Sequence, residues 1–236
     1  MTMTHRARWH YAALVTTIAT TFCLTATATA GPRYKKARFY AGLLKSYLLT
    51  KQHDEFKWFN EIRLADPDHA YGRLLLGALP IHSKVDQNRT VFKQLQSEEV
   101  SYVMSMVEPF ELNGERKYLR PVTPDEWHGI GVTQELFHAP DHEAMSIHTL
   151  EKATRKLDEL LRAGQTVYLH CKSGQGRSVM TAMGFFMRYY HWSAEEAEQF
   201  IRNERPQIKP NQKQRAKIQE FWRDVLLPEN RSLESS

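Results

Sequence analysis

The sequence predicts an α/β fold: a central, mainly parallel sheet flanked by helices. One observation is that short apolar runs with strand character alternate with segments whose apolar residues recur at helical spacing. Another is that one such run, residues 166–170, leads directly into a glycine-containing loop and an apolar helix. In open α/β sheets, loops at the carboxyl ends of strands carry ligands. With 236 residues, the chain is long enough for one well-buried domain plus an appendage.

The first half of the domain contains short buried strands. We expect residues 31–53 to form a basic linker or helix and the domain to begin near residue 54. The run LLLGALPI at residues 74–81 is wholly apolar and contains Gly77 and Pro80, as expected of a buried strand and its exit turn. Residues 85–96 are expected to be helical, VSYVMSM to form a second strand, and KYLRPV to be part of a third.

Helices dominate the second half. SIHTLEKATRKLDELLRAG has one apolar face, with Ser146 or Thr149 able to cap its start and Gly164 its end. VMTAMGFFMRYY is apolar enough to be a buried helix. Ser193 and Glu196 form a capping-box pattern that opens the next helix, and NQKQRAKIQEFWRDVLL forms the last one. These elements predict a domain over residues 54–228, followed by a disordered tail at 229–236.

The charge distribution argues against nucleic-acid binding. The net charge is +5, but residues 1–53 contain eight of the 32 basic residues and none of the 27 acidic ones. The remainder, with 24 basic against 27 acidic residues, is mildly acidic. The chain has only two cysteines, Cys23 and Cys171, so no disulfide framework is implied.

The N-terminal segment has the features of a targeting or anchoring sequence. Residues 11–30 are uncharged, although seven of these twenty are threonine, which weakens a membrane helix. Basic residues before this run and a small-x-small pattern ending at Ala30 favour a cleaved signal peptide. The basic cluster at 33–38 fits an uncleaved anchor, and the acid-free start fits a mitochondrial presequence. We therefore expect a membrane-associated or exported (periplasmic or secreted) protein, or one at the mitochondrial inner membrane.

The sequence HCKSGQGRS, residues 170–178, has the elements required to bind and attack a phosphate. Gly174 and Gly176 allow a tight turn whose N–H groups point inward, forming an anion nest at the start of the following helix. We expect this nest to bind the phosphate through the loop residues Lys172, Ser173, Gly174, Gln175 and Gly176. The loop lacks the Gly-Lys-Ser/Thr ending of a nucleotide-binding loop, so ATP is not the expected ligand.

Four side chains around this loop have chemical roles in the same prediction. The helix N-terminus and Arg177 should depress the pKa of Cys171, which makes its thiolate available as a nucleophile. Arg177 can hold two phosphate oxygens with its planar guanidinium. Ser178 is placed to donate a hydrogen bond to the sulfur, and His170 to orient the loop. A lone cysteine is more often a small buried residue, but the conjunction of these residues favours catalysis.

This loop resembles the signature of cysteine phosphatases of the protein tyrosine and dual-specificity class. The likeness extends over residues 57–223 and is closest to the mitochondrial-type phosphatidylglycerophosphate phosphatase branch. The matching stretches are WFNEI, LLLGALPI, MVEPFE, GVTQELFHAPD, TVYLHCKSGQGRS and HWSAEEAEQFIRNERPQI. Two features depart from that branch: Gln175 stands where a basic residue is usual, and EPFE replaces a more acidic tetrad.

Expulsion of the leaving oxygen requires a general acid. The resemblance implies that this acid is Asp141, which lies 30 residues before Cys171 between a predicted strand and helix. Glu143 is the alternative acid, and Asp141 could instead only cap the next helix. His138, Asp141 and His142 could also be read as metal ligands, but no further ligand is evident and the chemistry needs no metal or other cofactor.

The resemblance implies a phosphomonoester hydrolase that works through a cysteinyl-phosphate intermediate. We expect its substrate to be a lipid headgroup phosphate, as in phosphatidylglycerophosphate or a phosphoinositide, with Lys172 adding charge for a second phosphate. The alternative is a phosphotyrosine protein substrate. A catalytically silent phosphate-binding module would usually lack one of the catalytic residues. A sulfurtransferase or arsenate reductase also uses a loop cysteine, but no resolving cysteine follows Cys171.

Overall fold

The computed structural model describes residues 32–52, 57–64, 71–83, 91–113 and 119–234. The chain divides into two units, one ending at Phe56 and the other beginning at Lys57. The described part of the first unit is helix α2 (Pro32–Gln52), where the sequence predicted a basic linker or helix. The apolar run at 11–30, with Cys23, lies outside the described residues. Among the helices of the described ranges, none is both long and apolar enough to span a membrane.

The second unit is built on a five-stranded sheet. In spatial order, its strands are β1 (Phe59–Ile62), β2 (Arg73–Gly77), β7 (Thr166–His170), β4 (Tyr102–Val107) and β6 (Thr133–His138). The pairs β2–β7, β7–β4 and β4–β6 are parallel, and β1 joins the edge of β2 in antiparallel orientation. This confirms the predicted α/β fold. His170 stands opposite both Gly77 and Ser105, so the carboxyl ends of the three central strands meet at one edge.

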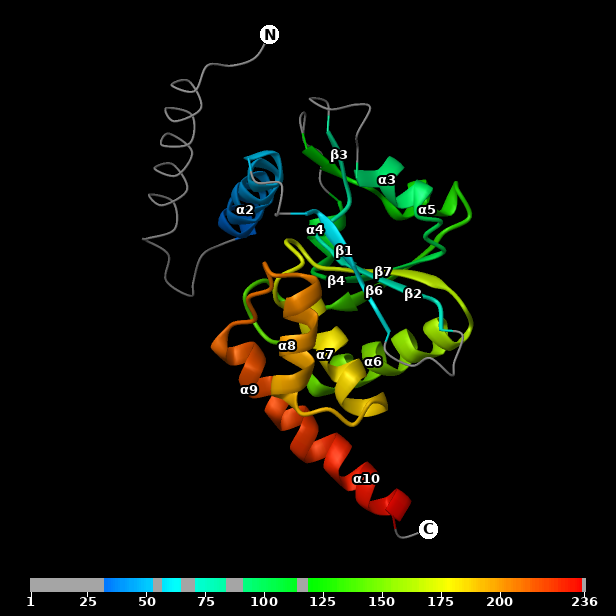
Figure 1. Cartoon of the computed structure of the whole chain (residues 1–236). Helices are drawn as coiled ribbons and strands as arrows, with labels where there is room; N and C mark the ends of the chain where they lie inside the picture. The colour runs from blue at the N-terminus through cyan, green and yellow to red at the C-terminus, as the bar shows by residue number, and fades with distance from the viewer. Residues whose placement is uncertain (1–31, 53–56, 65–70, 84–90, 114–118, 235–236) are drawn as a thin grey trace. The chain divides into compact units, whose positions relative to one another are not determined.

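A small second layer covers one side of this sheet (Figure 1). It contains the antiparallel pair β3 (Ile81–Ser83) and β5 (Leu119–Pro121), with helices α3 (Val91–Ser97), α4 (Pro109–Leu112) and α5 (Pro124–His128). The predicted third strand is thus β5. Helix α5 begins with a capping box between Thr123 and Glu126 and carries the fully buried Trp127.

On the opposite side of the sheet lie helices α6 (Ile147–Arg162), α7 (Arg177–Tyr189), α8 (Ala194–Glu204) and α9 (Gln212–Phe221) (Figure 1). Their starts follow the predicted caps. The Ser146 hydroxyl accepts a hydrogen bond from the Thr149 backbone N–H at 3.1 Å, and Ser193 and Glu196 form the capping box of α8. Gly164 follows α6 at a positive φ of 72°, where glycine is favoured.

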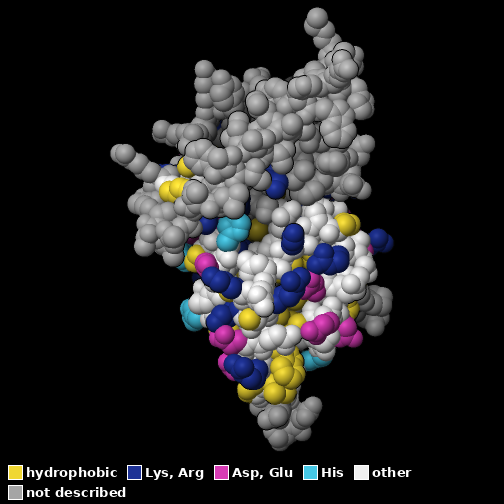
Figure 2. Space-filling model, turned by 90° about the vertical axis from the view of Figure 1, so that its left-hand side faces the viewer, with side chains coloured by type: hydrophobic (Ala, Val, Ile, Leu, Met, Phe, Trp, Pro, Cys, Tyr) yellow, Lys and Arg dark blue, Asp and Glu magenta, His cyan; other side chains and the backbone are white. Residues whose placement is uncertain are grey.

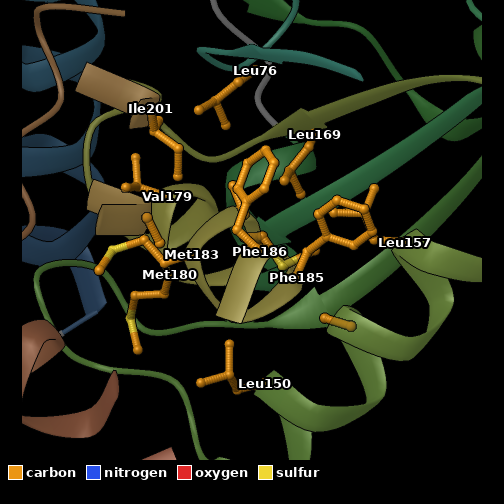
Figure 3. Packing of buried hydrophobic residues seen from close by; sticks show 14 of the residues in the cluster. Leu76, Leu150, Leu157, Leu169, Val179, Met180, Met183, Phe185, Phe186 and Ile201 are labelled. Carbon is orange, nitrogen blue, oxygen red and sulfur yellow. The ribbon is translucent and has the colours of Figure 1, made fainter. Parts of the chain in front are cut away.

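Helix α7 is the centre of the core. Every residue from Arg177 to Arg188 is buried, as the apolar sequence predicted. Figure 3 shows Phe185 and Phe186 of this helix among side chains from α6, α8 and the strands, including Leu157 and Leu169. Full burial of one such apolar side chain contributes about 1.5–3 kcal/mol. The helix that follows the glycine loop is therefore anchored firmly behind it.

The C-terminal end differs from the prediction. Helix α9 continues through a π-helical turn (Trp222–Leu226) into α10 (Leu227–Glu234), so residues 229–234 are helical and not a disordered tail. Glu229 explains this order, since its carboxylate accepts hydrogen bonds from Arg188 at 2.5 Å and Arg155 at 2.6 Å. Two arginines on α6 and α7 thus stabilise the segment, a long-range effect that its polar composition does not reveal.

The described surface carries both signs of charge. Figure 2 shows basic and acidic side chains interspersed on the described part of one face. Several form exposed ion pairs, such as Lys213 with Glu143 at 2.7 Å and Arg215 with Glu198 at 2.8 Å. Such exposed pairs stabilise the fold little.

Candidate active site

The loop from Cys171 to Gly176 connects the carboxyl end of β7, a central strand, to the first residue of α7. Gly174 lies in the left-handed region with φ 63°, and a Cβ there would stand 2.4 Å from the backbone carbonyl group of Gly77. A Cβ at Gly176 would stand 2.5 Å from the Gln214 side-chain oxygen. Only glycine therefore fits these two positions without displacing a neighbour.

The loop carbonyl groups are hydrogen-bonded from outside the loop. The backbone N–H groups of Leu79 and Lys209 donate to the carbonyl oxygens of Lys172 and Gln175, at 3.2 and 2.7 Å. The side chain of Arg205 donates to those of Ser173 and Gly174. In a planar trans peptide the N–H points opposite to the C=O. The N–H groups of residues 173–176 consequently face inward, as an anion nest requires.

Cys171 is a buried free thiol at the base of this nest. Burial by itself would raise its pKa. The charge of Arg177, a hydrogen bond from the Ser178 hydroxyl at 3.4 Å, and the backbone N–H groups of Ser178 and Gly176 outweigh burial and bring the pKa below its ordinary value. This favours a thiolate, the form of cysteine that attacks an electrophile.

Arg177 is buried beside an acidic residue that the sequence analysis did not single out. Its Nη1 and Nη2 donate to the two carboxylate oxygens of Glu111 at 2.5 and 3.1 Å, and Nη1 also donates to the Ala139 carbonyl at 2.8 Å. Burial lowers the pKa of Arg177, but the hydrogen bonds and charge of Glu111 reverse this and raise it. Arg177 is therefore a fixed cation whose guanidinium orientation is set by Glu111.

Asp141 also contacts this arginine. Its carboxylate accepts from Arg177 Nη2 at 3.1 Å and from Lys172 Nζ at 2.5 Å. Burial would raise the pKa of Asp141, but Lys172, Arg177 and His142 lower it below its ordinary value. These neighbouring cations thus favour the ionised carboxylate. Glu143, the alternative acid, is exposed and pairs with Lys213.

The structure places the Lys172 side chain in the protein interior, where it is buried and paired with Asp141. A buried ammonium group requires a nearby carboxylate, and Asp141 supplies it. Gln175 is half-buried and adds no charge to the loop.

His170 is fully buried, and burial lowers its pKa to about 3, so it is neutral. Its Nδ1 lies 3.2 Å from the Cys171 carbonyl oxygen and its Nε2 lies 2.8 Å from the Ser105 hydroxyl. Gln134 donates to the same hydroxyl at 2.8 Å. The ring thus connects the loop to Ser105 of β4 and, through that hydroxyl, to Gln134 of β6.

The structure brings together Cys171, Arg177, Ser178, Asp141 and His170, five of the residues that the sequence analysis singled out. Sequence reasoning missed Glu111, Ser105, Arg205 and Gln214, all buried polar residues from other segments. Of these, Glu111 and Arg205 had a signal, because both lie in stretches that match the family, EPFE and HWSAEEAEQFIRNERPQI. His138 and His142, considered as metal ligands, are exposed, and the described ranges hold no group of three potential metal ligands.

Known proteins share these features. The family model described as "Dual specificity phosphatase, catalytic domain" matches residues 85–224. The rat protein named phosphatidylglycerophosphatase and protein-tyrosine phosphatase 1 is 30% identical over 171 residues, which is 71% of this chain and 78% of the rat protein. An Arabidopsis phosphatidylglycerophosphate phosphatase, PTPMT1, is 28% identical over 173 residues, 73% of this chain but 45% of the plant protein.

Solved structures show the same likeness. PTPMT1 in complex with PI(5)P aligns with a TM-score of 0.58 and 26% identity, over 73% of this chain and 99% of that one. Kinase associated phosphatase aligns with a TM-score of 0.60 over 71% of this chain and 94% of that one, and at 22% identity it supports the fold alone. Since the family model covers more than half of the chain and its loop cysteine has the geometry described above, this chain belongs to the dual specificity phosphatase catalytic domain family and is a cysteine-dependent phosphatase.

Proposed function

We propose that this phosphatase hydrolyses the phosphomonoester of a phospholipid headgroup, with phosphatidylglycerophosphate as its preferred substrate. The observation that carries the proposal is the 30% identity, over 71% of this chain, to a protein named for phosphatidylglycerophosphate hydrolysis. The likeness to a PTPMT1 structure in complex with PI(5)P adds support for a phosphorylated lipid. The loop itself contacts only a phosphate group, so it is compatible with this substrate without selecting it.

In the first proposed step, the thiolate sulfur of Cys171 attacks phosphorus. A sulfur–phosphorus bond forms while the bond between phosphorus and the headgroup oxygen breaks. Asp141 in its protonated form transfers a proton to that leaving oxygen. The inward N–H groups of the loop and Arg177 stabilise the charge on the remaining phosphoryl oxygens.

In the second step, a water molecule attacks phosphorus and the sulfur–phosphorus bond breaks. The ionised Asp141 accepts the proton of the attacking water, which restores its acid form for the next cycle. The Ser178 hydroxyl, 3.4 Å from the sulfur, donates to the departing thiolate and stabilises it. Inorganic phosphate then leaves the nest.

Substrate binding has a further effect on Asp141 in this mechanism. In the described structure, its carboxylate occupies a hydrogen-bonding position on Arg177 Nη2. A phosphate that binds Arg177 with two oxygens takes this position and places negative charge beside Asp141. Nearby negative charge raises the pKa of a carboxyl group. Substrate binding therefore favours the protonated form that the first step needs.

A phospholipid headgroup can carry negative charge in addition to the reacting phosphate. Because Lys172 is paired with Asp141, another basic side chain near the loop is required to bind that charge. Lys209 is the residue whose backbone N–H binds the Gln175 carbonyl at 2.7 Å, and its side chain is exposed. Lys209 lies next to Gln175, which stands where the phosphatidylglycerophosphate phosphatase branch usually has a basic residue. We assign it the role that the sequence analysis gave to Lys172.

The second candidate substrate is a phosphotyrosine protein, which the printed names of the rat and human relatives also include. The test compares kcat/KM for phosphatidylglycerophosphate in mixed micelles with kcat/KM for phosphotyrosine peptides. The proposal expects at least about a tenfold preference for the lipid, about 1.4 kcal/mol in transition-state binding. Cys171→Ser serves as the inactive control.

The role of Lys209 is tested in the same assay. Lys209→Gln should reduce the preference for the lipid, while Lys217→Gln, an equal change of charge at a residue paired with Glu220, should leave it unchanged. A preference for phosphotyrosine peptides in the unchanged protein would contradict the lipid assignment and favour the second candidate.

We also propose that the first fifty residues bring the enzyme to a membrane. Residues 11–30 are uncharged, and basic residues lie on both sides of them. Attachment to the membrane would raise the local concentration of a lipid substrate. Cell fractionation of the full chain and of a chain lacking residues 1–30 tests this placement.

A further inference from the structure

Arg205 is a buried arginine that the mechanism above does not use. It follows the last residue of α8 and precedes Pro206, where the helix cannot continue. It is 0% exposed and is among the largest fully buried side chains of the described residues. Full burial of a charged side chain is unusual and calls for specific partners.

All five N–H donors of its guanidinium are used. Nε donates to the Gly174 carbonyl at 2.9 Å and Nη2 to the Ser173 carbonyl at 3.4 Å. The other three bonds reach the start of the domain: Nη2 to the Trp58 carbonyl, and Nη1 to the Lys57 carbonyl and the Asn60 side-chain oxygen. The side chain thus ties the phosphate loop to β1 and the residues before it.

Each of these acceptors is a neutral oxygen. Arg205 therefore carries a buried positive charge with no carboxylate among its hydrogen-bond partners. Burial lowers its pKa to about 10, and the nearby ionisable groups Tyr168 and Cys171 act in the opposite direction. It remains protonated at neutral pH. A buried cation without a counter-ion is costly, so the structure favours an anion in its vicinity.

The two loop bonds orient peptide groups toward that anion. When the carbonyls of Ser173 and Gly174 point to Arg205, the N–H groups of Gly174 and Gln175 point the opposite way, into the nest. Gly174 permits this approach, because a Cβ there would stand 2.8 Å from Arg205 Nη2. Arg205 thus orients the N–H donors of the phosphate site by binding the carbonyl groups on the opposite side of the same peptides.

We infer that Arg205 is a positioning residue for phosphate hydrolysis: it fixes two N–H donors of the anion nest, and its buried charge favours the Cys171 thiolate and the bound phosphate. The inference concerns the phosphate and not the leaving group. It therefore does not depend on whether the substrate is a lipid or a protein.

The test uses the full chain with Arg205→Gln and Arg205→Lys. The control is Arg202→Gln, the same change one turn earlier on α8, where the side chain binds the Ile208 carbonyl and Glu198 and no loop carbonyl. Three quantities are measured: the pH midpoint of Cys171 alkylation by iodoacetamide, the inhibition constant of orthovanadate on aryl phosphate hydrolysis, and the thermal unfolding midpoint.

Arg205→Gln should raise the alkylation midpoint by about one pH unit, because a positive charge near the thiolate is lost. It should also weaken vanadate inhibition about tenfold or more, which is about 1.4 kcal/mol. Arg205→Lys keeps the charge but loses the fork of donors. Its alkylation midpoint should stay close to that of the unchanged protein, while its vanadate inhibition weakens by about threefold or more. Arg202→Gln should change neither quantity.

A role confined to stability gives a different result. If Arg205→Gln folds with a lower unfolding midpoint but unchanged alkylation and vanadate inhibition, the inference is wrong. If Arg205→Gln does not fold, Arg205→Lys decides: weaker vanadate inhibition supports the inference, and inhibition equal to that of the unchanged protein overturns it.

Discussion

Replacement of Asp141 by asparagine tests two proposed roles of this residue: proton donor to the leaving group, and competitor with phosphate for Arg177. The substitution removes the transferable proton and the negative charge that contacts Arg177 Nη2 at 3.1 Å and Lys172 Nζ at 2.5 Å. General-acid catalysis contributes about 10²–10⁴-fold. We therefore expect kcat on an alkyl phosphate to fall about 100-fold or more, equivalent to about 2.7 kcal/mol. A nitrophenyl phosphate, whose leaving group needs no proton, should lose less than about tenfold.

The same variant should bind inorganic phosphate more tightly. In the described structure, the Asp141 carboxylate competes for a donor that the phosphate needs. A hydrogen bond to a charged group contributes about 1.5–3 kcal/mol, and the amide of asparagine retains part of it. A gain of about tenfold in affinity is therefore reasonable. Competitive inhibition of nitrophenyl phosphate hydrolysis by phosphate measures it.

Glu143→Gln is the matched control, a carboxylate-to-amide change two residues away at an exposed ion pair. It should leave both substrates and phosphate binding nearly unchanged. Equal losses on alkyl and aryl phosphates in Asp141→Asn would show that Asp141 is structural. A selective loss on alkyl phosphates in Glu143→Gln would assign the acid to Glu143 instead.

Four other predictions concern the nucleophile, its neighbours and the N-terminus. Cys171→Ser should abolish turnover yet still bind phosphate, and mild peroxide should inactivate the unchanged enzyme reversibly; residual hydrolysis in the serine variant would refute the cysteine mechanism. Glu111→Gln should lower the free energy of unfolding by about 3 kcal/mol in a urea titration, because it removes the carboxylate that accepts from both Nη atoms of the buried Arg177; an unchanged unfolding curve would contradict this. The pKa of Asp141 is lowered from 3.8, so its ion pairs stabilise the fold above about pH 4 and lose this effect as the pH falls through the lowered pKa. The difference in unfolding temperature between the unchanged protein and Asp141→Asn should therefore shrink as the pH falls below about 4. A difference that stays constant would show that the ion pairs do not stabilise the fold. Removal of residues 1–30 should release the protein from membranes without loss of specific activity on an aryl phosphate, and continued sedimentation with membranes would show that the attachment lies elsewhere.

The strand, loop and helix around Cys171 could be predicted from the sequence because their signals are local. β7, the loop glycines and α7 follow one another within residues 166–189. Here the β-branched and aromatic strand, the turn residues and the apolar helix each have their ordinary sequence pattern. The capping of α8 by Ser193 and Glu196 is local in the same sense.

The parts that could not be predicted depend on contacts between distant segments. Arg205 binds carbonyls 31 and 32 residues away, and Glu111 lies 66 residues from Arg177. Neither of these contacts in space can be inferred from a single sequence. Strand β1 was also missed, because FNEI is short and half polar, and its conformation depends on pairing with β2. The helical C-terminus was missed for the same reason, because Glu229 binds Arg155 and Arg188 on other helices.

The outward-facing carbonyls of the phosphate loop have a consequence for how the enzyme can change over evolution. The nest that receives the phosphate is made of backbone N–H groups, and backbone atoms and Arg205 hold it from behind. The side chains at positions 173 and 175 are not among the groups that hold it. Substitution there can alter which molecules approach the loop while the chemistry at phosphorus is retained. Gln175 stands at one of these two positions, and its half-buried side chain is outside the set of groups that hold the nest.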